Sequence, residues 1–281
     1  MFIHAVSQFV TPPVEHPRIL KEVLKGYTDT PFRRVNTFIL LALIGAHRCV
    51  QGRTPSGNAS VYLTTESGNL GDTNNVLDQL YRQRSLPMPF SFINTMSNTA
   101  PFYVAQSLNV LGRNLSISGR GLSFERGLEL ARLDFDSGSV EEALIGAVDE
   151  VPPEGGAAHP AVAGSFWIYV RKARNGALGE VAEVRSFPDR EALAAWCADR
   201  PVLPPGRGLL ACGAAVSDEE RTDWQRRTGL SLFDYVDDYG PFDTVTAYGV
   251  TKFLETAPPA SLLHINRNGQ GRHVALILNR Y

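Results

Sequence analysis

The sequence predicts a layered α/β protein with a largely parallel sheet, and two observations support this prediction. Short runs rich in β-branched and aromatic residues alternate with longer helical patterns along most of the chain. The chain has 281 residues, 43% of them hydrophobic, and can therefore bury a substantial core. Its formal net charge of −2 gives no electrostatic reason to expect a nucleic acid or an anionic membrane as a partner.

The expected strands and helices follow one another in a regular order. We expect strands at residues 2–9, 60–65, 113–118, 141–148, 164–172, 179–186, 208–213, 261–266 and 272–279. We expect helices at residues 17–26, 31–51, 72–84, 99–111, 122–136, 189–198, 217–228 and 243–255. Thr30 and Pro31 predict the start of the second helix, because a hydroxyl can cap free amides and proline fits the first helical position.

The longest apolar run, "FILLALIGA" from Phe38 to Ala46, is far shorter than the roughly 20 residues that span a bilayer. It predicts a buried helix. The opening residues "MFIHAVSQFV" lack the basic segment and long apolar core of a secretory signal. The cysteines are too far apart in the sequence for a zinc site or a redox pair: Cys49, Cys197 and Cys212. We therefore expect reduced thiols, no metal, no cofactor and a cytoplasmic location.

Two stretches rich in proline and glycine, 150–162 and 198–208, predict surface connections. Neither is long or polar enough for a flexible linker between domains, and no short repeat is visible. The stretch "ISGRGLSFERG" (117–127) predicts a sharp corner from a strand into a helix. Free amides at such a corner favour anions, lower the pKa of a thiol placed there and can form an oxyanion hole. The corner itself holds Gly119, Arg120 and Gly121, none of which is a nucleophile.

Three uses of this corner remain open on local grounds. A dinucleotide-binding turn needs a small residue where Phe124 stands, and a hydrolase elbow needs glycine where Glu125 stands. The third use is a plain glycine turn that relieves crowding, and the local sequence favours it.

The wider segment 92–150 resembles the N-terminal half of the β-ketoacyl synthases, the condensing enzymes of fatty-acid and polyketide synthesis. It contains "NTMSN" (94–98), "GRN" (112–114), the strand, the corner helix and "GAVDE" (146–150) in the family's order. Residues 32–48, 165–184 and 264–278 resemble the family's early buried helix, crossing strand with hairpin, and closing segment. The resemblance implies a thiolase-like (ketosynthase) layered αβαβα fold over 1–281, with an N-terminal half at 1–160 and a reduced C-terminal half at 161–281.

The resemblance also implies that the catalytic set is lost. The family's nucleophilic cysteine aligns with Gly121, or with Arg120 after a one-residue slip. No "HGT" occurs in the sequence, and Phe242 aligns best with the second catalytic histidine. The segment Gly269-Gln270-Gly271-Arg272 replaces the family's gating motif. The expected pocket therefore contains the following residues: Gly119, Arg120, Gly121, Phe242, Gly269, Gln270 and Gly271.

Several other residues are weaker candidates for chemistry. Ser118, Ser123 and His273 could act in a repurposed pocket, and His264 flanks the same closing turn, although ordinary structural roles are favoured for all four. Arg113 and Arg120 could contact an acyl carrier protein, with Arg126 and Arg132 further along the helix. The alternative for these arginines is pairing with acidic residues such as Glu125 and Glu129. Asp149 and Glu150 are expected to fix a turn.

The resemblance implies a catalytically degenerate, chain-length-factor-like partner of an active β-ketoacyl synthase, in a type II polyketide, aryl-polyene or fatty-acid-like pathway. It would not be a competent synthase on its own. Subunit contacts are expected near residues 94–118, through the strand 113–118 and the helix 99–111. Two alternatives stay open: an acyltransferase or hydrolase with a repurposed pocket, and a stand-alone acyl-binding or scaffolding homodimer.

Overall fold

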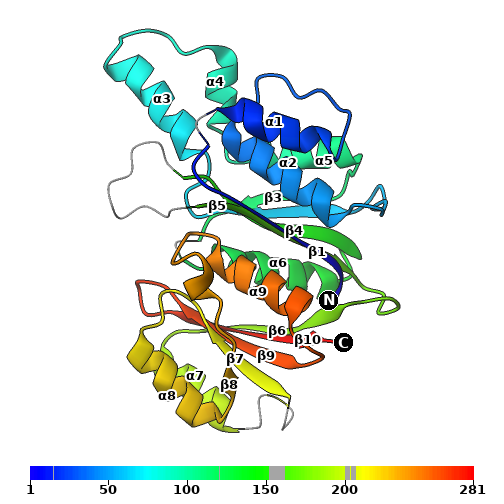
Figure 1. Ribbon diagram of the computed structural model, residues 1–281, viewed down its shortest axis with the longest axis vertical. Helices are drawn as coiled ribbons and strands as arrows, with labels where there is room; N and C mark the ends of the chain where they lie inside the picture. The colour runs from blue at the N-terminus through cyan, green and yellow to red at the C-terminus, as the bar shows by residue number, and fades with distance from the viewer. Residues whose placement is uncertain (15, 120, 152–161, 200–202, 204–206) are drawn as a thin grey trace.

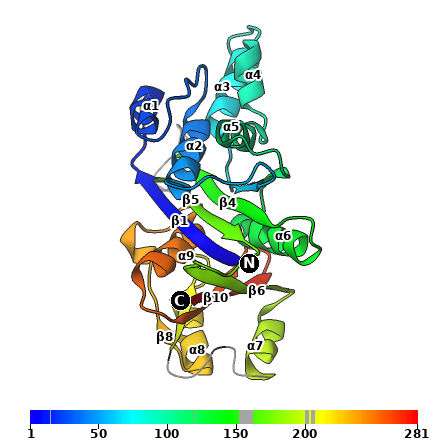
Figure 2. The ribbon, with the colours of Figure 1, turned by 90° about the vertical axis from the view of Figure 1, so that its right-hand side faces the viewer.

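The computed structural model describes residues 1–14, 16–119, 121–151, 162–199, 203 and 207–281. Five layers follow one another along the long axis of the molecule (Figure 1). Outer helices cover a first sheet, two helices lie between this sheet and a second one, and further helices cover the far side of the second sheet (Figure 2). The layered αβαβα fold expected from the sequence is therefore confirmed.

The two sheet layers are joined by hydrogen bonds into one ten-stranded order, β3-β2-β4-β5-β1-β6-β10-β9-β7-β8. Its first half consists of β1 (Phe2–Thr11), β2 (Ser60–Thr64), β3 (Asn114–Ile117), β4 (Glu142–Asp149) and β5 (Ala163–Arg171). Its second half consists of β6 (Gly179–Phe187), β7 (Gly208–Cys212), β8 (Ser231–Leu232), β9 (Ser261–Arg267) and β10 (His273–Arg280). The halves meet where β1 pairs with β6 in an antiparallel register, with Phe2 opposite Glu180.

The two halves have the same topology, and we call them the first and second units. In each unit the third strand lies at the outer edge, followed by the second, fourth, fifth and first. In each unit the second strand runs parallel to both neighbours, and the fifth strand is antiparallel to the fourth. The first strand of each unit is antiparallel to both of its neighbours as well. The prediction of a largely parallel sheet is therefore wrong: among the described residues, four strand pairings are parallel and five are antiparallel. The duplication that no sequence repeat reveals is therefore visible in the strand order. The second unit has five strands, as many as the first. In this order β5 belongs to the first unit, although the C-terminal half expected from the sequence begins at residue 161.

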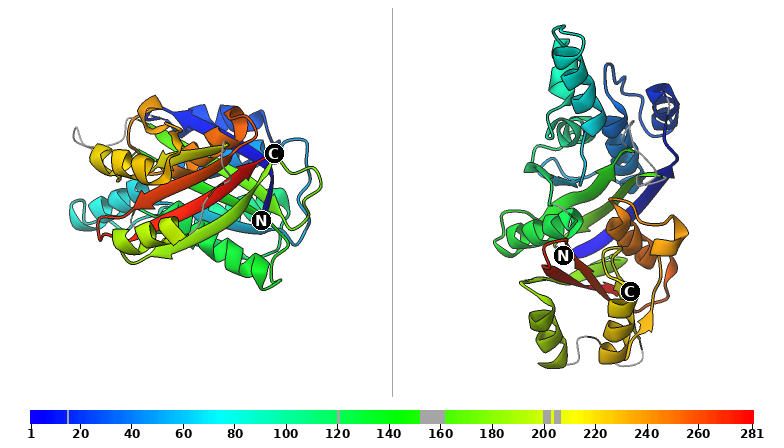
Figure 3. Two further views of the ribbon diagram at one scale, coloured as in Figure 1. Left: turned by 90° about the horizontal axis from the view of Figure 1, so that it is seen from below. Right: turned by 90° about the vertical axis from the view of Figure 1, so that its left-hand side faces the viewer.

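Two central helices, α6 (Ser123–Asp136) and α9 (Val245–Thr256), occupy equivalent places between the sheets (Figure 3). Each follows the edge strand of its unit, α6 directly after β3 and α9 after β8 and the short 3₁₀ helix η1 (Val236–Asp238). The outer layer of the first unit holds α1 (Pro17–Lys25), α2 (Thr37–Cys49) and α5 (Thr99–Leu108), and α3 (Leu70–Tyr81) and α4 (Pro89–Asn94) extend from it (Figure 1). The outer layer of the second unit holds α7 (Arg190–Asp199) and α8 (Asp218–Thr228).

The apolar run from Phe38 to Ala46 is buried along its whole length in α2, as expected. The start of this helix corrects the prediction from Thr30 and Pro31, because α2 begins at Thr37. Asn36 caps it, and its side-chain oxygen accepts a hydrogen bond from the Ile39 amide at 2.8 Å. Arg34 has a positive φ of 57°, which interrupts a helix that would begin at Thr30.

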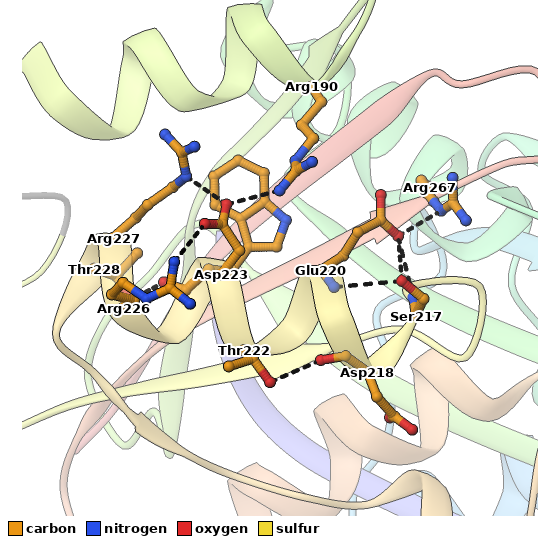
Figure 4. A network of polar contacts seen from close by, with 11 residues as sticks. Arg190, Ser217, Asp218, Glu220, Thr222, Asp223, Arg226, Arg227, Thr228 and Arg267 are labelled. Carbon is orange, nitrogen blue, oxygen red and sulfur yellow. Dashed lines mark hydrogen bonds and ion pairs between the residues drawn. The ribbon is translucent and has the colours of Figure 1, made fainter.

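The outer helix α8 is fixed by local polar contacts (Figure 4). Ser217 forms a capping box with Glu220: its hydroxyl accepts from the Glu220 amide at 3.3 Å, and the Glu220 carboxylate accepts from the Ser217 amide at 3.1 Å. Asp223 accepts from Arg190 of α7 at 2.7 Å and from Arg227 at 2.5 Å. These contacts join the two outer helices of the second unit.

Every expected strand and helix is present, and apart from the start of α2 the ends differ by only a few residues. The sequence patterns missed α4, η1 and β8, which are too short to show a period. The three cysteines are free thiols, as expected. Within the described ranges, no helix has both the length and the apolar character needed to cross a membrane.

Candidate functional site

The corner between β3 and α6 holds a carboxylate from another part of the chain. The amide of Gly121 donates to Glu66 Oε2 at 2.6 Å, and the amide of Ser123 donates to Glu66 Oε1 at 2.9 Å. Leu122 occupies the N-cap position of α6 and offers no side-chain cap. Glu66, from the turn that follows β2, therefore satisfies the free amides at the start of this helix.

The two serines at the corner have structural partners. Ser123 is 3% exposed, and its Oγ accepts a hydrogen bond from the Gly119 amide at 2.8 Å. Ser118 Oγ donates to the Glu66 carbonyl at 3.4 Å. No base is among these partners, so neither hydroxyl is activated as a nucleophile. Gly121 has a φ of 87°, and a Cβ added there would lie 3.7 Å from Asn268 Cβ. The position has room for a side chain but a backbone conformation that favours glycine.

A small polar cavity of about 20 Å³ lies beside the corner, enough for about one water molecule. Four carboxyl-bearing residues line it, together with serine and threonine hydroxyls and two apolar side chains. The lining residues are Thr64, Thr65, Glu66, Gly121, Ser123, Phe124, Glu125, Ala147, Asp149, Asp243, Thr244 and Thr246. A cavity of this size cannot hold an acyl chain.

Asp149, at the end of β4, holds the turn that presents Glu66. Its carboxylate accepts from the Thr65 hydroxyl at 2.5 Å and from the amides of Glu66 and Ser67 at 3.0 and 2.9 Å. Burial, followed by the negative charge of Asp243, raises the pKa of Asp149 to about 8, although these donors oppose the shift. Asp243 in turn accepts from Ser67 Oγ at 2.5 Å. The turn is thus held from β4 and from the segment that leads into α9.

Glu125 and Asn266 connect α6 to the second unit. Asn266 Nδ2 donates to Glu125 Oε1 at 2.7 Å and to Thr246 Oγ1 at 3.1 Å. Burial raises the pKa of Glu125 to about 7. Glu150 accepts from the Gly71 amide at 3.1 Å, and burial raises its pKa to about 7 as well. Both carboxyls serve as hydrogen-bond acceptors that fix the surrounding backbone and side chains.

The two histidines near the closing turn lie outside this cavity. His264 faces the layer of α6 and α9, where its Nε2 is 2.7 Å from the Tyr235 hydroxyl, and burial lowers its pKa to about 3. His273 lies on the opposite face of the sheet, which it shares with Ala275 and Ile277 of the same strand, toward α7 and α8. Its Nδ1 is 2.9 Å from the Gly271 carbonyl oxygen, and burial lowers its pKa. Neither imidazole lines the cavity beside Gly121.

The cavity includes only part of the pocket expected from the sequence. Gly121 lines it, whereas Phe242 packs into the core against Phe166, with 5.9 Å between the ring centroids, and its neighbour Asp243 lines the cavity instead. A Cβ added at Gly269 or Gly271 would meet nothing within 4 Å. Gly119 shapes the corner through Ser123, Gln270 is exposed, and Arg120 lies outside the described residues.

The arginines expected at a carrier-protein surface have acidic partners. Arg113 pairs with Asp134 at 2.6 Å, Arg126 with Glu129 at 2.5 Å, and Arg132 with Asp136 at 2.9 Å. Of the described residues, no three or more His, Cys, Asp or Glu are grouped so that they could hold a metal ion.

Asp149 fixes a turn, as expected from the sequence, but sequence reasoning missed Glu66, although a signal for it existed. Glu66 and Asp149 stand at or just after the ends of β2 and β4, which are adjacent parallel strands. Carboxyl ends of parallel strands meet at one edge of a sheet, where α/β proteins place their sites. The "TTES" run (64–67) after a buried strand therefore indicated a polar site at this edge.

No model of a known protein family and no curated protein matches the sequence. Solved structures do match. The ishigamide ketosynthase/chain length factor has a TM-score of 0.77 at 16% identity, covering 99% of both chains. A ketosynthase structure with a type II polyketide acyl-carrier protein (AntDE:AntF) has a TM-score of 0.73 at 10% identity, over 100% of this chain and 99% of that one. The ketosynthase ApeO with its chain length factor ApeC, from Xenorhabdus doucetiae, has a TM-score of 0.58 at 11% identity, covering 100% of both.

These likenesses extend over nearly the whole chain. At such low identity they establish the fold, and they confirm the resemblance inferred from segments 92–150 and 264–278. The chain has the thiolase-like fold of the ketosynthases and chain length factors.

Proposed function

We propose that this protein is the non-condensing, chain-length-factor-like partner of an active β-ketoacyl synthase, in a type II polyketide, aryl-polyene or fatty-acid-like pathway of the cytoplasm. The corner carries the proposal: Gly121 stands where a nucleophile would be needed, and Glu66 occupies the adjacent amides. A chain of this fold without a nucleophile can still contribute shape to an assembly. Its apolar helices would help to wall the space that receives the acyl chain, while the partner performs the chemistry.

The remaining thiols and histidines do not replace the missing catalytic groups. Burial raises the pKa of Cys49 and Cys212 to about 12 and that of Cys197 to about 11, so all three stay protonated near neutral pH. None of them lines the cavity at the corner. The alternative of an acyltransferase or hydrolase acting through Ser118, Ser123 or His273 is disfavoured because both serine hydroxyls bond to the backbone and His273 does not line the cavity.

The pairing surface that we propose joins the free edge of β3 to an apolar face beside it. β3 lies at the end of the sheet, and its four residues are partly exposed. Unpaired edges of this kind favour pairing with another chain. Exposed apolar side chains gather on α3, α4, α5 and their connections, which we call the α3–α5 face: Leu77, Leu80, Tyr81, Leu86, Met88, Phe90, Phe92, Ile93, Met96, Phe102 and Leu111.

Exposure on this face is unusually high for large apolar residues, reaching 91% at Leu86 and 88% at Leu111. Apolar surface gathered in one region of a folded chain favours a protein contact. The β3 edge, Met96, Phe102 and Leu111 lie in the region 94–118 that the sequence suggested for subunit contact, and the rest of the α3–α5 face extends the proposed surface to earlier residues. A stand-alone homodimer would use the same surface, so the experiment must separate the two partners.

The experiment is co-expression with a condensing β-ketoacyl synthase of the same organism, followed by light scattering on the purified complex. We expect a one-to-one heterodimer, and condensation of acyl and malonyl carrier thioesters by the complex and not by this chain alone. Mass spectrometry of the chain incubated with acyl carrier thioesters should find no covalent adduct. A stable homodimer that does not bind the synthase would support the stand-alone scaffolding homodimer. A covalent adduct on Ser123 would support an acyltransferase or hydrolase.

A further inference from the structure

We infer that the amides of Gly121 and Ser123 form a binding site for one carboxylate, and that Glu66 is its resident ligand, which keeps the corner closed to ligands from outside the chain. The inference concerns the corner itself and does not depend on the proposed pairing with a synthase. Each carboxylate oxygen of Glu66 accepts from a different amide, at 2.6 and 2.9 Å. A two-point contact of this kind fixes the orientation of the carboxylate as well as its position.

The backbone around Glu66 is built to present this side chain. Asp149 accepts from the amides of both Glu66 and Ser67, and the Ser118 hydroxyl donates to the Glu66 carbonyl. The Thr65 amide donates to the Ile117 carbonyl at 3.0 Å, which joins the turn to the end of β3. Because the turn is held on both sides, little rotational freedom remains to be lost when the Glu66 carboxylate meets the two amides.

A second observation indicates a place for a small polar ligand next to Glu66. Thr244 lines the same cavity, is 3% exposed, and its hydroxyl has no hydrogen-bond partner. Buried hydroxyls are normally paired, and the cavity has space for about one water-sized molecule. Removal of the Glu66 side chain would add its volume to this space and free the two amides.

The groups around the cavity explain why Glu66 excludes a second anion. Asp243 lines the same space together with Glu125 and Asp149, whose pKa values burial raises to about 7 and about 8, and the described lining residues include no lysine or arginine. Among the described residues, the amides and the dipole of α6 favour negative charge here, and Glu66 already occupies them. A single carboxylate can be accommodated, and an incoming carboxylate or acyl oxyanion would have to displace Glu66. The corner is thus closed to acyl chemistry by its occupied amides as well as by its missing nucleophile.

The test uses acetate as the probe and amide NMR shifts as the readout. In Glu66→Ala, we expect saturable shifts of the Gly121 and Ser123 amides as acetate is added, whereas the wild-type protein shows none. Glu129→Ala is the control, because it removes a carboxylate of the same helix that lies outside the cavity and does not free the amides, and it should behave like the wild type. Acetate binding by the wild type, binding by Glu129→Ala equal to that of Glu66→Ala, or no binding by Glu66→Ala would each overturn the inference.

A second measurement covers the case in which Glu66→Ala fails to fold. A cysteine is introduced by Gly121→Cys in a Cys197→Ala background, with and without Glu66→Gln, and iodoacetamide modification is followed by mass spectrometry. The negative charge of Glu66 disfavours a thiolate at position 121, and Glu66→Gln removes this charge, so we expect the change to raise the modification rate near neutral pH on the order of tenfold. Equal modification rates with and without the Glu66→Gln change would show that the carboxylate does not control the corner, and would overturn the inference.

Discussion

The two units share one strand order but differ in what covers them. The outer helices of the second unit are tied to each other and to the sheet by ion pairs and caps, with Asp223 between Arg190 and Arg227 and Glu220 beside Arg267 (Figure 4). The α3–α5 face of the first unit instead exposes aromatic and aliphatic side chains. The edge strands differ too, since β3 offers four residues and β8 only two. The pairing that we propose therefore uses the first unit, while the outer helices of the second unit are held by polar contacts within the chain.

The largest expected effect comes from charging the apolar face. Phe102→Asp combined with Leu111→Asp should weaken the complex with a synthase more than about 100-fold, because buried aromatic and aliphatic contacts dominate interface energies. Arg226→Asp on α8 is the control, since Arg226 is largely exposed and belongs to the second unit. Binding is measured by biolayer interferometry on the co-expressed synthase. Unchanged affinity of the double variant would place the interface elsewhere.

The equivalent positions of the central helices allow a prediction about packing. Gly127 and Gly249 are each the fifth residue of their helix, α6 and α9. A Cβ at Gly127 would collide with Thr64 Cγ2, and one at Gly249 would lie 2.7 Å from the Tyr235 ring. Alanine usually stabilises a helix relative to glycine, but here we expect each Gly→Ala change to lower the free energy of unfolding by about 1–3 kcal/mol.

Urea denaturation checks this prediction, with Gly57→Ala as the control because a Cβ there would meet nothing within 4 Å. If Gly127→Ala and Gly249→Ala stabilise the protein, the close packing of both central helices is not as described. If only one of them destabilises it, the two units differ in their cores as well as on their surfaces.

Much of this architecture could be predicted from the sequence, and the reasons are local. Continuous apolar runs predicted α2 and β4, because both elements are buried along most or all of their length. The family resemblance placed Gly121 at the corner. The cavity was harder to predict from the sequence, because Glu66 accepts from amides 55 and 57 positions away in the chain. No short-range sequence pattern encodes such a contact. The alignment selected Phe242, whose neighbour Asp243 lines the cavity, because an alignment cannot tell which of two adjacent residues faces the core.

The buried carboxyls predict a pH dependence that belongs to the first unit. The pKa of Asp149 is about 8 in the folded chain against about 3.8 when exposed, so the folded chain binds this proton more tightly. Its contribution to stability is complete below about pH 4 and is lost as the pH rises to about 8, by up to about 1.4 kcal/mol per pH unit. Glu125 and Glu150, with pKa values of about 7, act in the same direction.

Urea denaturation at about pH 5, 6.5 and 8 should therefore show the free energy of unfolding decreasing with pH, and Asp149→Asn should make this decrease shallower. Asp223 of the second unit is the control. Hydrogen bonding to Arg227 lowers its pKa, so its contribution is present above the unfolded pKa and is lost only in more acidic solution. Asp223→Asn should leave the slope between pH 5 and 8 unchanged. The buried histidines His264 and His273, whose pKa values are lowered, act in the opposite direction below about pH 6.5. A flat profile of the wild type between about pH 6.5 and 8 would therefore contradict the burial of the three carboxyls.

The smallest expected effects compare how two helices are capped. Ser217 caps α8 from the adjacent residue, whereas Glu66 caps α6 from a distant turn that also contacts the end of β3. Ser217→Ala should lower the free energy of unfolding by about 1 kcal/mol and leave synthase binding unchanged. Glu66→Ala should cost a similar amount, on the order of 1 kcal/mol, and should also weaken synthase binding a few-fold, because it loosens the corner where the proposed edge strand ends. Urea denaturation and biolayer interferometry separate the two effects. If Glu66→Ala changes stability alone, the corner is a local cap with no part in pairing, and the contrast between the two units is confined to the α3–α5 face.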